Sequence, residues 1–300
     1  MKVTVAGGYG VGLVMRVHRA PEAGESLSDG VLSRGHGGKG SNQAVAARRL
    51  GAGVALLTAV GDDAAGADAQ RLWAQEGIDA TGVRVVPDAS TMTGFIVVDA
   101  TGENRIIIAP GALETLTPED AEAQRATIAG SDALIVSLEV PAAFAGAALR
   151  IAREEGVLTV FNPAPAKDVP ADLWAAADIV TPNLTEARAL LGIGDEAAPS
   201  HELASQLRAR LGADVVLTLG GEGSVVADAS GIRPVAAVAP DRVVDTTGAG
   251  DAFTAALTVG RLATGSLAAA AAFAAHAGAH TVARPDVIPA LPRRDELPAF

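Results

Sequence analysis

Two glycines and an acidic residue in the stretch Val243–Phe253 have the types and spacing needed to move a phosphoryl group. Gly248 and Gly250 carry no Cβ, so consecutive N–H groups of this turn can point into one space. The Ala-rich sequence that follows predicts a helix, and a helix N-terminus adds partial positive charge that favours phosphate oxygens. Gly248, Ala249 and Gly250 are therefore candidates for an anion hole.

Asp251 follows the turn directly and falls in the first turn of the predicted helix. The helix field favours an ionised carboxylate at this place, and a base beside an anion hole is what phosphoryl transfer to a hydroxyl requires. The alternative is an Asp that caps a helix after a Gly turn, and an isolated GxGD pattern is more often that. The rest of the chain has to decide between the two interpretations.

A second glycine-rich segment, Gly37–Ala44, leads directly into another predicted helix. Gly38 permits close approach of the backbone, and Lys39 and Asn42 can hydrogen-bond a small polyol. The spacing is not that of a Walker A loop, and a Gly-rich helix start is often only structural. Glu139 ends a strand at the same rim, where it is either a ligand for hydroxyls or a solvated loop acid.

Asn183 and Glu186 lie three residues apart, between a predicted strand and a predicted helix. On one face of the first turn, they could organise Mg²⁺ through water and contact phosphate oxygens. The same spacing is that of a capping box, in which the two side chains bind backbone N–H groups of the helix start. Both interpretations remain open.

Two further glycine-rich turns follow strands. The segment Thr218–Gly223 can cradle a nucleotide or form a hairpin turn. The segment Gly7–Gly12 does not match GxGxxG, and the sequence after it, Leu13–Val17, is extended rather than helical. A dinucleotide site is therefore disfavoured.

Alternating β and α patterns run through the chain and would bring these motifs together. Strands are predicted at Lys2–Ala6, Val54–Val60, Ala133–Ser137, Leu158–Phe161, Ile179–Thr181, Val215–Leu219 and around Val243, and helices at Ser41–Leu50, Ala67–Glu76, Ala142–Glu155, Glu202–Leu211 and Asp251–Ala263. Repeated units of this length imply a parallel sheet covered by helices on both faces. Ligands of such sheets bind beyond the carboxyl ends of the strands, where the motifs fall.

Two segments, Leu13–Gly35 and Thr91–Pro110, break the alternation. They are rich in β-forming residues and lack helical periodicity, which predicts a small β flap or an edge extension of the sheet. A flap would exclude water, which competes as a phosphoryl acceptor. We expect one α/β domain over residues 1–300 with a lid formed by residues of about 13–35 and 91–110.

The composition excludes several classes of function. The 300 residues are 49% hydrophobic and carry a net charge of −12, which disfavours nucleic-acid and anionic-membrane partners. There is no Cys, so thiolate metal sites and Cys nucleophiles are excluded. The N-terminal residues lack the pattern of a signal peptide and no apolar run is long enough to cross a membrane, so we expect a cytoplasmic protein.

The types and order of the motifs are together more specific than any one of them. The chain resembles the ribokinase (PfkB carbohydrate kinase) family over nearly its whole length. The two family signatures look like Gly37–Ala44 and Asp245–Phe253, and Gly61–Asp63, Asn162–Ala166 and Thr181–Glu186 are also similar to ribokinases. The resemblance implies a three-layer α/β/α fold with a mostly parallel central sheet and a small β lid.

The resemblance also assigns roles to individual residues. Asp251 would take the proton from the primary hydroxyl of the sugar, beside the anion hole of Gly248, Ala249 and Gly250. Sugar hydroxyls would be held by Gly38, Lys39, Asn42 and Glu139. The ATP site would include Asn183, Glu186, Thr218, Gly220, Gly223, Gly250 and, near the adenine, His276. Glu186 would hold Mg²⁺ through water, and Asp245 with the Thr247 carbonyl would match a monovalent-cation site, usually K⁺.

Two departures from the family pattern concern the acceptor and the cation. Ribokinases carry Asn-x-Asp after the first strand to grip secondary hydroxyls, and Gly10 and Gly12 stand at those positions here. The missing side chains would leave volume for a larger or less hydroxylated substrate, unless a nearby residue substitutes. The late loop that helps to enclose the cation is here Asp286–Ala290, where Asp286 could supply a different ligand.

The leading hypothesis is an ATP-dependent kinase that phosphorylates a primary hydroxyl of a sugar, with ribose as the default acceptor. A nucleoside or another furanose is the main alternative because of Gly10 and Gly12. A non-catalytic sugar-binding or nucleotide-binding regulator is less well supported, since Asp251 and the Gly-Ala-Gly turn are intact. We also expect a homodimer that binds ATP with Mg²⁺ and a small sugar or nucleoside, with no nucleic-acid or membrane partner.

Overall fold

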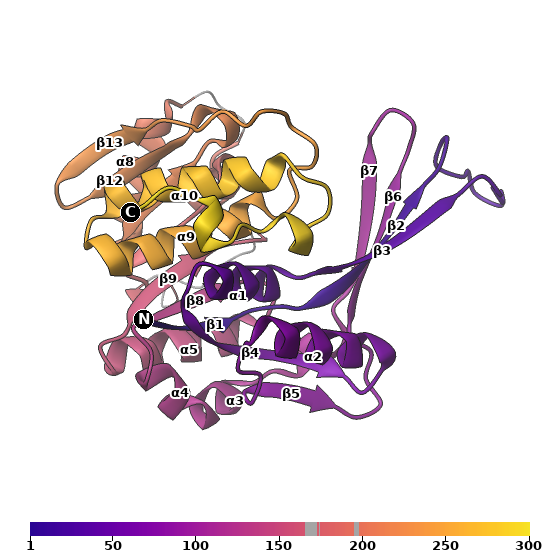
Figure 1. Ribbon diagram of the computed structural model, residues 1–300, viewed down its shortest axis with the longest axis horizontal. Coiled ribbons are helices and arrows are strands. Elements are labelled where there is room, and N and C mark those ends of the chain that lie inside the picture. The colour runs from indigo at the N-terminus through magenta and orange to yellow at the C-terminus, as the bar shows by residue number, and fades with distance from the viewer. Residues whose placement is uncertain (166–172, 174, 195–197) are drawn as a thin grey trace.

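The computed structural model describes residues 1–165, 173, 175–194 and 198–300, and it contains two β-sheets of different size (Figure 1). Ala166, the last residue of the motif Asn162–Ala166, lies outside the described residues. The larger sheet forms the α/β body, and the smaller sheet projects from it as a lid (Figure 1).

The strands and helices follow the chain in an alternating order. The strands are β1 (Lys2–Ala6), β2 (Gly10–Arg16), β3 (Val31–Gly37), β4 (Gly53–Gly61), β5 (Val83–Val86), β6 (Met92–Val98), β7 (Asn104–Ala109), β8 (Ala133–Ser137), β9 (Leu158–Asn162), β10 (Ile179–Val180), β11 (Asp214–Thr218), β12 (Ser224–Asp228) and β13 (Gly231–Val235). The α-helices are α1 (Lys39–Arg49), α2 (Ala64–Glu76), α3 (Pro118–Ala123), α4 (Arg125–Ala129), α5 (Ala142–Glu154), α7 (Leu184–Leu191), α8 (Ser200–Leu211), α9 (Ala249–Thr264) and α10 (Leu267–Val282). Short 3₁₀ turns are η1 (Gly111–Thr115), η2 (Gly220–Glu222), η3 (Ile288–Ala290) and η4 (Arg294–Glu296).

The larger sheet has the strand order β13-β12-β11-β10-β9-β8-β1-β4-β5 within the described residues. All neighbouring strands from β11 to β5 are parallel, and only β12 and β13 at one edge are antiparallel. The mostly parallel sheet expected from the sequence is thus confirmed.

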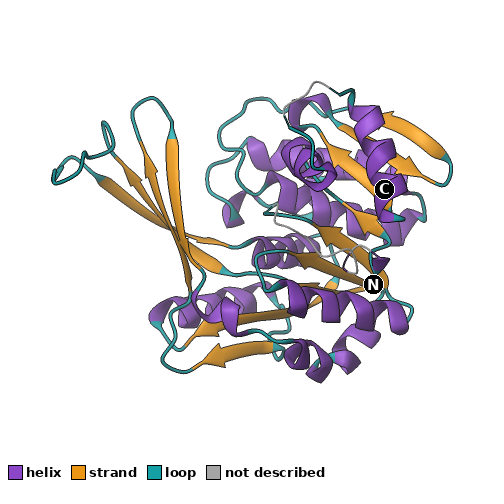
Figure 2. Ribbon diagram, turned by 180° about the vertical axis from the view of Figure 1, so that it is seen from behind, coloured by secondary structure: helices purple, strands orange, loops and turns teal. Residues whose placement is uncertain are grey.

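Each face of this sheet packs against its own layer of helices (Figure 2). Alternate residues of a strand point to opposite faces, so on β4 Leu57 and Ala59 belong to one core and Leu56 and Val60 to the other. The first core is completed by α3, α4, α5, α7 and α8, and the second by α1, α2, α9 and α10. Strands buried on both faces explain the apolar runs in the sequence.

The lid is a four-stranded sheet with the order β3-β2-β6-β7. It confirms the expected small β lid, although its strands begin earlier than predicted, because β2 already starts at Gly10. Gly10 and Gly12 therefore lie within a lid strand rather than in a loop after β1. Gly10 pairs with Gly37 on β3 and with Met92 on β6, so the root of the lid adjoins the segment Gly37–Ala44.

One predicted strand is wrong. Residues around Val243 form no strand, and Val243 and Val244 are 67% and 44% exposed. Branched side chains favour an extended backbone, but a strand also needs a partner. The N–H of Val244 instead donates to the carbonyl of Val282 at the end of α10, over 2.7 Å. The other predicted strands and helices agree with the structure to within three residues at each end.

Candidate active site

Asp251 lies in the first turn of α9, where it is 6% exposed. Two amide side chains from α1 hold its carboxylate: Asn42 Nδ2 donates to Oδ2 over 2.8 Å and Gln43 Nε2 donates to Oδ1 over 3.3 Å. Both carboxylate oxygens are thus occupied by donors from a helix about 210 positions earlier in the chain. The side chain is held in one orientation.

Gln43 was not among the predicted site residues, although it lies inside the segment Gly37–Ala44. Its Nε2 also lies 3.2 Å from Asn162 Oδ1, at the end of β9. Asn162 Nδ2 in turn donates to the Thr181 carbonyl over 2.9 Å. A buried chain of amides therefore ties Asp251 to the carboxyl ends of two sheet strands. The signal in the sequence was the pair of adjacent amide side chains, Asn42 and Gln43, that follows the glycines. Only Asn42 was considered as a site residue.

Lys39 and Glu139 meet at the start of α1. The backbone N–H of Lys39 donates to Glu139 Oε2 over 2.5 Å. A Cβ on Gly8 would lie 2.7 Å from the same oxygen, so only glycine lets β1 end this close to Glu139. The position of Glu139 at a strand end confirms the expected rim location, but it is not a solvated loop acid.

Three carboxyl groups surround the single ammonium group of Lys39. Burial alone would lower the pKa of Lys39, but Asp251, Glu139 and Glu186 outweigh it and raise that pKa. Protein surrounds most of the Glu139 carboxyl, and this burial raises its pKa to about 7 against the opposing charge of Lys39. At neutral pH the Glu139 carboxyl is therefore only partly ionised.

Burial raises the pKa of Asp251, while Lys39, Asn42 and Gln43 oppose the increase. The expectation that the helix field would decide its ionisation is therefore incomplete, because desolvation is the larger effect. A carboxylate with a raised pKa is a stronger base than an exposed one.

Asn183 and Glu186 form the capping box that the spacing allowed. Asn183 Oδ1 accepts the N–H of Glu186 over 2.8 Å, and Glu186 Oε2 accepts the N–H of Asn183 over 2.8 Å. Glu186 is 8% exposed, and burial raises its pKa against the effects of Asn183 and Lys39. The capping interpretation is thus confirmed, and the Glu186 carboxyl also belongs to the charge cluster around Lys39.

The segment Thr218–Gly223 connects the antiparallel strands β11 and β12, so its hairpin interpretation is also confirmed. Thr218 N–H donates to the Pro182 carbonyl over 2.9 Å, which places the hairpin next to the start of α7. Gly220 and Gly223 both have positive φ, as glycine turns allow. His276 lies partly exposed on α10.

Comparison with known proteins gives the family. A model described as pfkB family carbohydrate kinase matches residues 10–294. The chain belongs to the PfkB carbohydrate kinase family. It is 35% identical over 299 residues to a ribokinase of Haemophilus influenzae, covering 99% of this chain and 97% of that relative.

Two further matches show the same relationship. A bifunctional ribokinase/ribose-5-phosphate isomerase A of Fructilactobacillus sanfranciscensis is 34% identical over 99% of this chain, which spans 55% of that relative. The structure of Arabidopsis thaliana ribokinase complexed with ribose and ATP superimposes with a TM-score of 0.89 at 27% identity, covering 98% and 96% of the two chains. The protein is a ribokinase-like carbohydrate kinase, a phosphotransferase with an alcohol group as acceptor. Within the described residues, no helix is both long and apolar enough to cross a membrane.

The turn predicted to form the anion hole begins at Gly248, which has φ of 80° and caps α9. A Cβ there would lie 2.6 Å from Val287 Cγ1, so the segment after α10 covers the turn with an apolar side chain. Asp245 Oδ1 accepts the N–H of Thr247 over 2.9 Å. The K⁺ site expected at Asp245 and the Thr247 carbonyl stays a prediction.

The volume expected from the missing side chain at Gly10 is filled. A Cβ on Gly10 would lie 2.5 Å from Met92 Cε. At Gly12 there is room, since the nearest atom to a Cβ would be Ile96 Cδ1 at 3.9 Å. The prediction of free volume is therefore wrong at Gly10, because Met92 of β6 occupies the place of the missing side chain. At Gly12 the prediction is correct.

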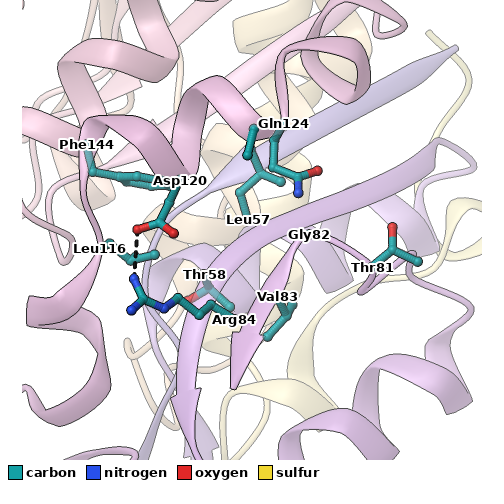
Figure 3. A pocket seen from close by; sticks show the side chains of 11 residues that line it. Leu57, Thr58, Thr81, Gly82, Val83, Arg84, Leu116, Asp120, Gln124 and Phe144 are labelled. Atoms are coloured by element: carbon teal, nitrogen blue, oxygen red, sulfur yellow. Dashed lines mark hydrogen bonds and ion pairs between the residues drawn. The ribbon is translucent and has the colours of Figure 1, made fainter. Parts of the chain in front are cut away.

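A separate small pocket lies between β4, β5, α3 and α5 (Figure 3). Arg84 Nη1 and Asp120 Oδ2 form an ion pair over 2.9 Å at its wall. The pocket contains none of the predicted site residues, so it is not the candidate active site.

Proposed function

We propose that this kinase transfers the γ-phosphoryl group of ATP to a primary hydroxyl of a furanose, with the 5-hydroxyl of ribose as the default acceptor. The observation that carries the proposal is the placement of Asp251. It is buried at the N-terminus of α9, beside the glycine turn, with each of its oxygens held by an amide of α1.

Asp251 acts as the general base. As the acceptor oxygen bonds to the γ-phosphorus, the bond from this phosphorus to the bridging oxygen of the β-phosphate breaks and ADP leaves. The hydroxyl proton passes to the Asp251 carboxylate, whose raised pKa favours the transfer. Gly38, Lys39, Asn42 and Glu139 would hold the acceptor. Fixing both reactants in one orientation lowers the barrier further, because the hydroxyl is presented in line with the phosphorus.

The N–H groups of Gly248, Ala249 and Gly250 would stabilise the charge on the transferring group. Asn183, Thr218, Gly220, Gly223 and His276 would line the ATP site. Bound with ATP, Mg²⁺ neutralises charge on the phosphate oxygens. Glu186 would hold it through water with Oε1, since its Oε2 already accepts the N–H of Asn183.

The test is ADP formation from ATP with a panel of pentoses, hexoses and nucleosides, with and without K⁺. We expect turnover with at least one furanose, with ribose as reference. A nucleoside that outperforms every free sugar would favour the nucleoside-kinase alternative, for which the room at Gly12 is the supporting observation. Binding of ATP without turnover of any acceptor would favour a non-catalytic regulator.

The variant Asp251→Asn tests the base. It keeps the size of the side chain but cannot accept the proton, so kcat should fall by about 10²–10⁴-fold while sugar binding remains. Calorimetric titration of ATP and sugar measures the binding. Wild-type kcat in this variant would refute the mechanism.

We further propose a homodimer formed through the lid. Edge strand β7 exposes three consecutive isoleucines, Ile106, Ile107 and Ile108, at 54%, 71% and 59%. An exposed, apolar edge strand is a surface that pairs with another chain. Because this edge can pair with an identical edge, we expect its partner to be a second copy of the same chain.

A further inference from the structure

Met92 fills the place in which a side chain at position 10 would lie. Gly10 and Met92 are register partners on β2 and β6 at the root of the lid. A Cβ on Gly10 would lie 2.5 Å from Met92 Cε, 3.1 Å from Cγ and 2.9 Å from the Met92 carbonyl oxygen. Met92 is 8% exposed, so packing fixes its thioether in this place.

The lid face that includes Gly10 is apolar along both central strands. Alternate residues of a strand share one face, and β2 and β6 are parallel and in register. That face carries Gly10, Gly12 and Val14 on β2, and Met92, Gly94 and Ile96 on β6. None of these side chains donates a hydrogen bond.

The polar groups of the site adjoin the Gly8–Gly10 segment, since a Cβ on Gly8 would lie 2.7 Å from Glu139 Oε2. A Cβ on Gly38 would lie 2.8 Å from Gly10 N, so the start of α1 packs directly on this segment. Lys39 and Glu139 meet there through a 2.5 Å hydrogen bond. An acceptor held by Gly38 and Glu139, as proposed above, would therefore lie beside Gly10 and the Met92 thioether.

We propose that Met92 determines acceptor specificity, and that the preferred acceptor is a furanose without a hydroxyl on the edge that faces Gly10 and Met92. The inference rests on the kinase activity proposed above and names the class of its acceptor. A hydroxyl against Met92 loses its water without gaining a partner, whereas a methylene group loses nothing. An apolar pocket rejects an added hydroxyl by up to about 100-fold.

The experiment compares ribose with 2-deoxyribose and 3-deoxyribose, in the wild type and two variants. Met92→Gln keeps the length of the side chain and adds an amide that can bind a hydroxyl, and Met92→Leu is the apolar control. Turnover is measured as ADP formation. Sugar binding is measured by calorimetry with each substitution also combined with Asp251→Asn, so that affinity is known independently of catalysis. Thermal unfolding of each variant reports its stability.

In the wild type, one deoxy sugar should exceed ribose in kcat/KM and affinity by about 10–100-fold. Met92→Gln should reduce that ratio at least tenfold, and Met92→Leu should leave it within about twofold. Ribose preferred over both deoxy sugars, equal shifts in the two variants, or no binding of any of the three sugars would each overturn the proposal. If Met92 has only a structural role, its substitution should lower the unfolding temperature without changing the ratio of deoxy sugar to ribose. Binding in the expected ratio without ADP formation would refute the kinase proposal alone.

Discussion

At the scale of single residues, the ionisation of Asp251 is set by two opposing effects. Burial raises its pKa, whereas the charge of Lys39 and the hydrogen bonds from Asn42 and Gln43 favour the charged form and lower it. The two amides therefore do more than orient the carboxylate. They also set the pH at which the base becomes available.

Gln43→Ala should separate this effect from simple packing. Loss of the donor at Oδ1 raises the pKa of Asp251 further, so the acidic limb of the kcat/KM profile should move to higher pH, with kcat reduced about tenfold. The profile is measured with saturating ATP. A matched change at a buried residue that does not touch Asp251, Thr258→Ala, should leave the limb in place, and an unchanged limb in Gln43→Ala would contradict the argument.

Glu139 gives a prediction for stability. Its pKa rises on folding from the usual 4.5 to about 7, so the folded state binds more protons than the unfolded state between these values. Protonated Glu139 therefore contributes its full share of the free energy of unfolding below about pH 4.5. This contribution is lost as the pH rises through about 7. Glu139→Gln removes this loss. Relative to wild type, the variant should gain up to about 3 kcal/mol in free energy of unfolding between pH 5 and pH 8.

Urea denaturation at several pH values measures the effect of Glu139→Gln. The control is Glu119→Gln at an exposed position of α3, which should leave the pH dependence unchanged. A difference between Glu139→Gln and wild type that stays constant with pH would show that the folded-state pKa is not raised.

At the scale of elements, the root of the lid depends on the cap of α2. Asp63 Oδ1 accepts the N–H of Gly66 over 2.8 Å and the Thr91 hydroxyl over 2.6 Å, and its Oδ2 accepts the N–H of Thr91 over 2.9 Å. One side chain thus begins a helix of the body and fixes the residue before β6. These hydrogen bonds lower the pKa of Asp63 in spite of its burial.

Asp63→Ala should therefore cost about 2–3 kcal/mol of stability, because it removes a cap and leaves the Thr91 donors unpaired. Hydrogen exchange of the β6 amides should accelerate in the same variant. The neighbouring change Asp62→Ala is the control, since Asp62 accepts only the Asp88 N–H, over 3.1 Å, among the described hydrogen bonds, and it should cost less than about 1 kcal/mol. Equal losses in the two variants would rule out a special role of this cap.

Local sequence patterns predicted most elements because each strand and helix has its own periodicity. They failed where a feature depends on distant packing. Val243 and Val244 favour strand structure, yet no strand lies beside them in the described structure. The missing side chain at Gly10 looked like free volume, but Met92, from another part of the chain, fills it. Gln43 was overlooked because only folding brings α9 beside α1.

Motifs with two local meanings could not be resolved from spacing alone. Asn183 and Glu186 form a capping box, and the same Glu186 carboxyl faces Lys39 within the charge cluster. The sequence shows the first arrangement, since it is local. The second depends on α1 and α7 lying at the same edge of the sheet, which follows only from the strand order β10-β9-β8-β1.

At the scale of the whole molecule, the lid stands apart from the body and exposes β7 along its full length (Figure 1). If the proposed dimer forms through this edge, Ile107→Glu should convert it to a monomer, because like charges would face each other across the pairing. Sedimentation velocity measures the mass. Ile232→Glu on β13, at an edge of the larger sheet, where Ile232 is 43% exposed, is the control and should leave the mass unchanged. A wild-type protein that sediments as a monomer would exclude the dimer.

The contact between Gly10 and Met92 restricts the order in which this pocket can acquire a different specificity. Any side chain added at position 10 would collide with Met92, so a chain that gains one there first would pass through a strained and destabilised protein. Shortening the residue at position 92 first leaves a cavity and removes the contact with Met92 Cε. A side chain added later at position 10 then has only the 2.9 Å approach to the carbonyl oxygen of residue 92 to relieve. Mutational histories that exchange the apolar contact for a polar one should therefore change position 92 before position 10, and the two positions should be found only in compatible combinations.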